Sequence, residues 1–199
     1  MPQVVFLDTN VMLDYLEGRN QEVIDIVSQL ILLHEMGKII LATSIFNIAE
    51  LLDKEFEIHY IGHLINQRFS FDEIWKKKND REEIRKSAQA CNNAIRRKIN
   101  RFVFEKSIMV LTPKFENNNW HEDYAQLYSL IYEAQLDSQD AMIVVIALQN
   151  DVTYFLSNDS NLVRQLNEKS LIDAYSLRDP GMRESFKNNV INSLMEELK

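Results

Sequence analysis

Residues 4–16 read VVFLDTNVMLDYL, and this stretch decides the fold of the chain. Four apolar residues at 4–7 predict a short buried strand over residues 3–7, and the apolar positions after Asn10 have the spacing of a helix. Asp8, Thr9 and Asn10 stand at the junction. A buried strand that passes directly into a helix is typical of α/β proteins, so these polar residues should lie at the carboxyl end of a strand.

The composition is that of a globular protein with one domain. The chain has 199 residues, of which 46% are apolar and 26% charged. No apolar run is long enough to cross a bilayer, and no leader precedes the first strand, so we expect a cytoplasmic protein without a membrane partner. Cys91 is the only cysteine, which excludes an intramolecular disulfide and agrees with a reducing compartment.

The charge is distributed unevenly along the chain. The net charge is −8, yet residues 68–106 carry 12 Lys or Arg against 6 Asp or Glu, a balance of +6. The remaining residues then hold 10 basic against 24 acidic side chains, a balance of −14. Such asymmetry indicates that the middle of the chain has a role of its own.

Strand and helix patterns alternate along the rest of the sequence. Further strands are predicted at 38–43, 107–112, 152–159 and 171–177, and helices at 22–36, 45–57, 120–135, 138–151 and 180–199. Ser44 is the expected N-cap of the helix at 45–57. The pattern predicts a three-layer α/β/α sandwich with a parallel, roughly five-stranded sheet. Residues 57–107 read as a helical insertion within a single domain that spans 1–199.

Four acids lie where the ends of parallel strands should meet. Ligands of open parallel sheets bind beyond the carboxyl ends of the strands. The acids are Asp8 after the first strand, Glu50 on the helix after the second, Asp140 in the first turn of an apolar helix, and Asp159 after the fourth. Clustered carboxylates repel one another unless a cation lies between them, and Mg²⁺ prefers such oxygen ligands. The placement therefore indicates a Mg²⁺ or Mn²⁺ site suited to phosphodiester hydrolysis.

Each acid also has a purely structural interpretation. Asp8 could cap the helix that follows it, and Asp159 could belong to an ordinary polar turn. Asp137 and Asp140 could together cap the apolar helix. Glu50 shares a polar stripe with Asn47 and Lys54, which favours a solvated helix face. Only the joint placement of the four argues for a site.

Four segments together resemble the PIN-domain nuclease family. They are FLDTNVMLDYL, ATSIFNIAELL, LDSQDAMIVVIAL and YFLSNDSNL, and they cover the α/β core in the expected order. The triplets DTN and SND are the most specific pieces. Many members of that family are ribonucleases, including the toxins of bacterial toxin–antitoxin pairs.

The resemblance implies roles for individual residues. Asp8, Glu50, Asp140 and Asp159 match the family's acidic metal-binding quartet. The positions that match supporting polar residues are Asn10, Ser44, Ser157 and Asn158. Asp137 is an additional acid, so the third ligand is Asp140 or Asp137, and we favour Asp140 because the apolar helix follows directly from it. The implied activity is endoribonuclease cleavage of RNA with Mg²⁺ or Mn²⁺.

The partners that the resemblance implies are an RNA substrate and an antitoxin protein. The long insertion departs from compact toxins, which leaves the toxin role open. The apolar face of the C-terminal helix packs either on the core or on a second copy, so a homodimer also stays open.

The insertion supplies a candidate nucleic-acid surface. Arg96, Arg97, Lys98 and Arg101 lie around one side of a predicted helix. A phosphate backbone is the natural partner of such a surface, although a solvated helix face would look the same. Trp75, Phe102 and Phe104 could stack on bases, although Phe102 and Phe104 are expected in the core.

Two other functions compete with a nuclease. A non-catalytic PIN-like module would bind RNA or protein without cutting it, but a binding surface has no need of four clustered acids. A phosphatase that uses Asp8 as its nucleophile usually needs an acid two residues later, and this chain has Asn10 there.

Overall fold

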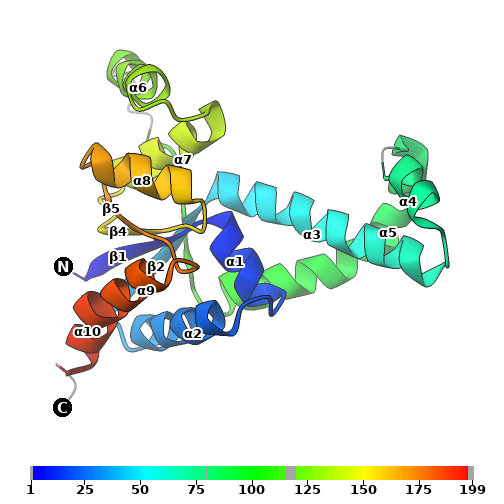
Figure 1. Cartoon of the computed structure of the whole chain (residues 1–199), viewed down its shortest axis with the longest axis horizontal. Helices are drawn as coiled ribbons and strands as arrows, with labels where there is room; N and C mark the ends of the chain where they lie inside the picture. Colours follow the sequence, from blue (N-terminus) through cyan, green and yellow to red (C-terminus); the bar gives the residue numbers. More distant parts are fainter. Residues whose placement is uncertain (1, 79, 115–119, 197–199) are drawn as a thin grey trace. The chain divides into compact units, whose positions relative to one another are not determined.

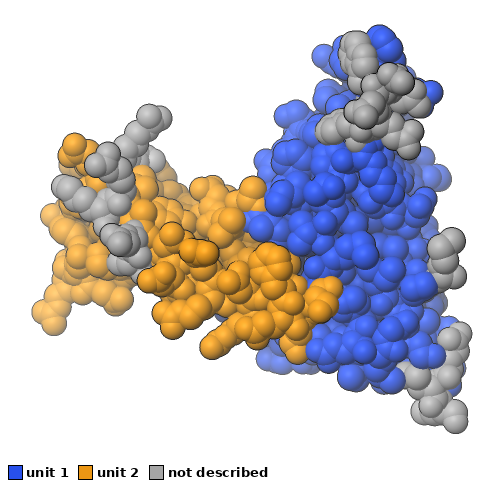
Figure 2. Space-filling model, turned by 180° about the vertical axis from the view of Figure 1, so that it is seen from behind, with its two compact units in different colours: residues 1–48, 108–199 blue, residues 49–107 orange. Residues whose placement is uncertain are grey.

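The computed structural model describes residues 2–78, 80–114 and 120–196. The chain divides into two compact units, which are residues 1–48 with 108–199 and residues 49–107 (Figure 2). The unit boundary falls inside helix α3, Ile45–Asn66, and the second unit begins eight residues before the predicted insertion at 57.

The first unit is built around a parallel five-stranded sheet of order β3-β2-β1-β4-β5. The strands are β1 (Gln3–Leu7), β2 (Ile39–Ser44), β3 (Met109–Leu111), β4 (Tyr154–Leu156) and β5 (Asp173–Tyr175). This architecture confirms the predicted α/β fold. Strand β1 lies at the centre, paired with β2 on one side and β4 on the other, so chain connections change direction there.

Helices cover both faces of the sheet. Figure 1 shows α7 (Ser138–Gln149) and α8 (Ser160–Glu168) on one side, and α2 (Gln21–Glu35) and α9 (Pro180–Phe186) on the other. The remaining elements of this unit are α1 (Thr9–Leu16), α6 (Trp120–Tyr128), η2 (Ser129–Glu133), η3 (Lys187–Asn192) and α10 (Ser193–Glu196), where η denotes a π-helical segment. The last three residues of the helix predicted at 180–199 lie outside the described residues.

The core forms because strand residues alternate between the two faces. Phe6 and Phe155 stack with ring centroids 4.8 Å apart, and both belong to the hydrophobic cluster that includes α7 and α8. Val5 and Leu7 point to the opposite face, and both are fully buried. Because β1 is buried on both faces, the backbone that leads into Asp8 is held rigidly.

The second unit is helical. It contains most of α3, then α4 (Phe71–Lys77), α5 (Arg81–Ile99) and the π-helical segment η1 (Asn100–Phe104). Glu55 on α3 is fully buried, and Lys98 on α5 contacts it with Nζ 3.0 Å from Oε2. Burial lowers the pKa of Lys98.

Candidate functional site

The carboxyl ends of β1, β2 and β4 bring together polar residues from distant parts of the sequence. Leu7 pairs with Leu156, and the backbone N–H of Asp8 donates to the carbonyl of Leu156 over 3.0 Å. Ser157 directly follows Leu156, the last residue of β4, and therefore lies beside Asp8. Asp8 and Ser157 are 7% and 0% exposed.

The carboxylate of Asp8 receives hydrogen bonds from three directions. Its Oδ1 accepts from the backbone N–H of Thr9 at 2.7 Å and from Nδ2 of Asn47 at 2.8 Å. Its Oδ2 accepts from the hydroxyl of Ser157 at 2.6 Å. These bonds offset the cost of burying the carboxylate and fix its orientation.

Asn47, in the first turn of α3, was missed as a site residue. Its side chain is fully buried, and Nδ2 also donates to Thr9 Oγ1 at 3.0 Å, while Oδ1 accepts from the hydroxyl of Ser44. Ser44 in turn accepts from the backbone N–H of Asn47 at 3.1 Å, which is the predicted N-cap bond. Ser44 therefore reaches Asp8 through Asn47.

Asn10 and Ser157 support the turn that carries Asp159. Ser157 Oγ accepts from Asn10 Nδ2 at 3.2 Å and from the backbone N–H of Asp159 at 3.0 Å. Asn10 Oδ1 accepts from the backbone N–H of Asn158 at 2.7 Å. The turn after β4 is thus tied to α1 by side chains that the sequence had singled out.

A second acid, Asp14, extends this network and was not predicted. Its side chain is 1% exposed, and it accepts from Nε and Nη2 of Arg178 at 2.9 and 2.7 Å. It also accepts from Nδ2 of Asn158 at 2.9 Å. The hydrogen bonds with Asp14 raise the pKa of Arg178. The only sequence signal was one acid within the otherwise apolar run VMLDYL.

The two acids near the start of α7 have different surroundings. Asp137 is exposed, and its Oδ1 accepts from the backbone N–H groups of Gln139 and Asp140, both at 2.9 Å. Asp137 is therefore the N-cap of α7. Asp140 is half-buried in the first turn of that helix.

Asp159 and Glu50 complete the predicted quartet. Asp159 is exposed and caps α8, with Oδ1 accepting from the N–H groups of Asn161 and Leu162. Glu50 is half-buried on α3 and belongs to the second unit. Within residues 2–78, 80–114 and 120–196, no three His, Cys, Asp or Glu side chains are grouped so as to hold a metal ion.

The predicted nucleic-acid residues lie at the end of α5 and in η1. Arg96, Arg97 and Arg101 are exposed. Lys98 instead turns toward the buried Glu55. Phe102 is 4% exposed, as expected of a core residue, whereas the expectation that Phe104 is buried was wrong, since it is 67% exposed.

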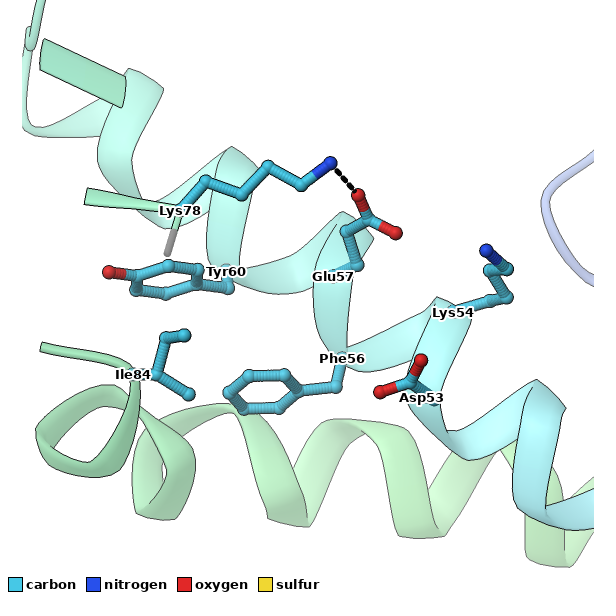
Figure 3. Close-up of a pocket in the computed structure, with 7 residues that line it drawn as sticks. All are labelled: Asp53, Lys54, Phe56, Glu57, Tyr60, Lys78 and Ile84. Carbon is cyan, nitrogen blue, oxygen red and sulfur yellow. Dashed lines mark ion pairs between the residues drawn. The ribbon is translucent and has the colours of Figure 1, made fainter. Parts of the chain in front are cut away.

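The second unit also contains a cavity of about 440 Å³ (Figure 3). Its lining comprises Asp53, Lys54, Phe56, Glu57, Tyr60, Lys78 and Ile84. The two lysines are matched by two acids, and Lys78 forms an ion pair with Glu57 that lowers the pKa of this acid through the hydrogen bond. The lining therefore offers a ligand no net charge.

Comparison with known proteins supports the fold. No family model and no curated protein matches this sequence. Among solved structures, VapBC-1 from nontypeable Haemophilus influenzae is similar, with a TM-score of 0.50 and 14% sequence identity. The match covers 89% of this chain and 100% of that one. This likeness supports the α/β fold described above. No helix in the described part of the chain is long and apolar enough to span a membrane.

Proposed function

We propose that this protein is a metal-dependent nuclease that hydrolyses RNA phosphodiester bonds at the edge of the sheet marked by Asp8. The observation that carries the proposal is the Asp8 carboxylate, which is buried at the end of the central strand and held by three donors. Burying a carboxylate costs free energy, so an acid that is held buried in a fixed orientation indicates a role in the fold or in a site. The likeness to VapBC-1 and the DTN and SND motifs favour a site.

Carboxylates are the kind of ligand that a hard divalent cation prefers. Mg²⁺ is commonly held by one or two carboxylates and keeps several waters beside a substrate phosphate. The residues that we propose to hold Mg²⁺ or Mn²⁺ are Asp8, Asp140 and Asp159 of the first unit. Their role as ligands rests on the family resemblance, since no three acids among the described residues are grouped as a metal site. When bound, such an ion activates water and neutralises charge on the phosphate. Asn47 and Ser157 hold the Asp8 carboxylate, and Asn10 holds the turn of Asp159.

A cleavage assay with matched variants tests this function. A labelled single-stranded RNA is incubated with the wild type in Mn²⁺, in Mg²⁺ and in EDTA, and with Asp8→Asn protein. We expect cleavage only with metal, and a loss of at least about 100-fold for Asp8→Asn because a ligand carboxylate is removed. Asp179→Asn is the control, because Asp179 caps α9 in the same unit and asparagine also caps well.

Two outcomes of the assay would contradict the proposal. Cleavage by Asp8→Asn protein at the wild-type rate, after contaminating nuclease is excluded, would remove Asp8 from the chemistry. Tight RNA binding without turnover in either metal would instead identify a non-catalytic binding module.

The partners that we propose for such a nuclease are an antitoxin protein and a second copy of this chain. The support is the PIN-like fold shared with VapBC-1 together with the toxin-like motifs. RNA as the substrate agrees with a cytoplasmic location. Light scattering on the purified chain distinguishes the 23.4 kDa monomer from a dimer.

A further inference from the structure

The exposed side of α5 and η1 is basic. Residues 84–104 carry six Lys or Arg and no Asp or Glu, in a chain whose net charge is −8. Six exposed side chains form what we call the arginine face: Asn93, Arg96, Arg97, Asn100, Arg101 and Phe104. The face therefore presents three guanidinium groups, two amides and one phenyl ring, and it contains no acid.

The helix itself sets this side apart. Cys91, Ile95 and Ile99 are at most 6% exposed and recur at intervals of four residues, so the arginine face lies on other sides of the helix. At η1 the backbone N–H of Glu105 donates to the carbonyl of Asn100 over 3.0 Å, which widens the turn. Phe102 and Val103 are buried in this turn, while Phe104 is exposed.

The three arginines are available to an anion in a way that Lys98 is not. Among the ion pairs of the described residues, none involves Arg96, Arg97 or Arg101. Arg97 donates through Nε to the carbonyl of Asn93, and its guanidinium group stays exposed. Lys98 is engaged with buried Glu55, so we leave it out of the face.

We propose that the arginine face binds single-stranded RNA, which rests on the proposed function for the choice of RNA. Guanidinium groups bind phosphates through paired N–H donors, and the positive charge matches a polyanion. An exposed phenylalanine can stack on a base that is unpaired, whereas the bases of a duplex are already stacked. Asparagine amides can donate to sugars and base edges. In this proposal the arginine face binds the RNA substrate and takes no part in cleavage.

Helix α4 is the competing surface in the same unit. Phe71 and Trp75 are 77% and 62% exposed, with ring centroids 6.4 Å apart. However, Asp72 and Glu73 lie on the same helix, and Lys77 and Lys78 are ion-paired with Glu83 and Glu57. Charge therefore favours the arginine face over α4.

Binding is measured by the fluorescence anisotropy of a labelled 12-residue single-stranded RNA, with full-length protein in EDTA and a gel to verify that the RNA stays intact. We expect Phe104→Ala to weaken binding roughly 5- to 100-fold through the loss of one stacked base. The plot of log affinity against log salt has a negative slope, and Arg97→Gln and Arg101→Gln should each reduce its magnitude by about 0.7. Single-stranded DNA of the same sequence and duplex RNA are run in parallel, and the duplex should bind more weakly.

Two matched variants serve as controls. Trp75→Ala removes an equally exposed aromatic side chain from α4, and Arg164→Gln removes an exposed arginine of α8 that is paired with Glu168. Both should bind RNA as the wild type does. The proposal is overturned if Trp75→Ala weakens binding and Phe104→Ala does not. It is also overturned if Arg97→Gln and Arg101→Gln leave the salt dependence of the affinity unchanged, or if a poly-glutamate peptide binds in preference to RNA. Because no cleavage is measured, failure here leaves the nuclease test unaffected, and the reverse also holds.

Discussion

At the scale of single residues, a buried amide orients the acid on which the proposed chemistry depends. Asn47 is fully buried and links three polar groups, namely Asp8, Thr9 and the hydroxyl of Ser44. An amide can do this because it donates from its nitrogen and accepts at its oxygen. Aspartate in the same place would set a second charge against Asp8.

Replacing Asn47 with alanine should destabilise the protein measurably. The change removes a buried donor to the Asp8 carboxylate and the acceptor of the Ser44 hydroxyl, so we expect a loss of about 1–3 kcal/mol in the free energy of unfolding. Urea denaturation monitored by circular dichroism measures it. Asn192→Ala is the control, because Asn192 is exposed and its amide donates to the side chain of Asn188 in the same helical segment. Equal stabilities for the two variants would mean that the Asn47 network contributes little.

At the scale of elements, Asp14 and Arg178 join α1 to the segments that follow β4 and β5. The two residues are 164 positions apart in the sequence. Asp14 is buried, whereas the side chain of Arg178 is 52% exposed, and Asn158 contributes a third hydrogen bond. The pair therefore fixes the turn that leads to Asp159.

Removing one partner of this pair should cost more than removing both charges. Arg178→Ala leaves the Asp14 carboxylate buried without its guanidinium, so we expect a loss of roughly 1–3 kcal/mol in the free energy of unfolding. The double variant Asp14→Asn with Arg178→Gln has no buried charge at position 14 and should recover part of that loss. Chemical denaturation of both proteins compares them. A double variant less stable than Arg178→Ala would show that the charge on Asp14 is itself stabilising.

The elements were largely predictable from local patterns. Apolar runs and caps are local signals, so β1 and the apolar helix α7 were found where they were expected. The position of Asp8 was foreseeable because strand ends of a parallel sheet meet at one edge, whereas Ser157 was indicated by the family resemblance. Ser44 was foreseeable as a cap because that bond spans only three residues.

The features that the sequence did not predict depend on contacts between residues far apart in the chain, which local patterns do not encode. Asn47 shares a polar stripe with Glu50, and periodicity alone placed that stripe in solvent, although Asn47 is buried against Asp8. No pattern near Asp14 in the sequence predicts its contact with Arg178. Phe104 was expected in the core together with Phe102, but it is 67% exposed. Residues two positions apart on a helical turn face different sides, so the two phenylalanines do not share an environment.

At the scale of the whole molecule, burial differs strongly between the sheet and parts of the helical unit. Val5, Phe6 and Leu7 in β1 are fully buried, and so is Phe155 in β4. Helix α4 contains no buried residue and is held at its start by the capping box of Ser70 and Glu73. Segments with few buried apolar contacts open at a lower free energy than a central strand does.

Hydrogen–deuterium exchange should therefore rank the elements in a defined order. The amides of β1 and β4 should exchange slowest, because they open only when the sheet of the first unit unfolds. The amides of residues 71–77 should exchange fastest, and α5 should be intermediate because Ile95 and Ile99 are buried. Peptide-level mass spectrometry over a time course from seconds to hours measures this order. If α4 were as protected as β1, the capping box and its neighbours would contribute far more stability than their exposure implies. Addition of single-stranded RNA should slow exchange at residues 93–104, because this segment carries the arginine face.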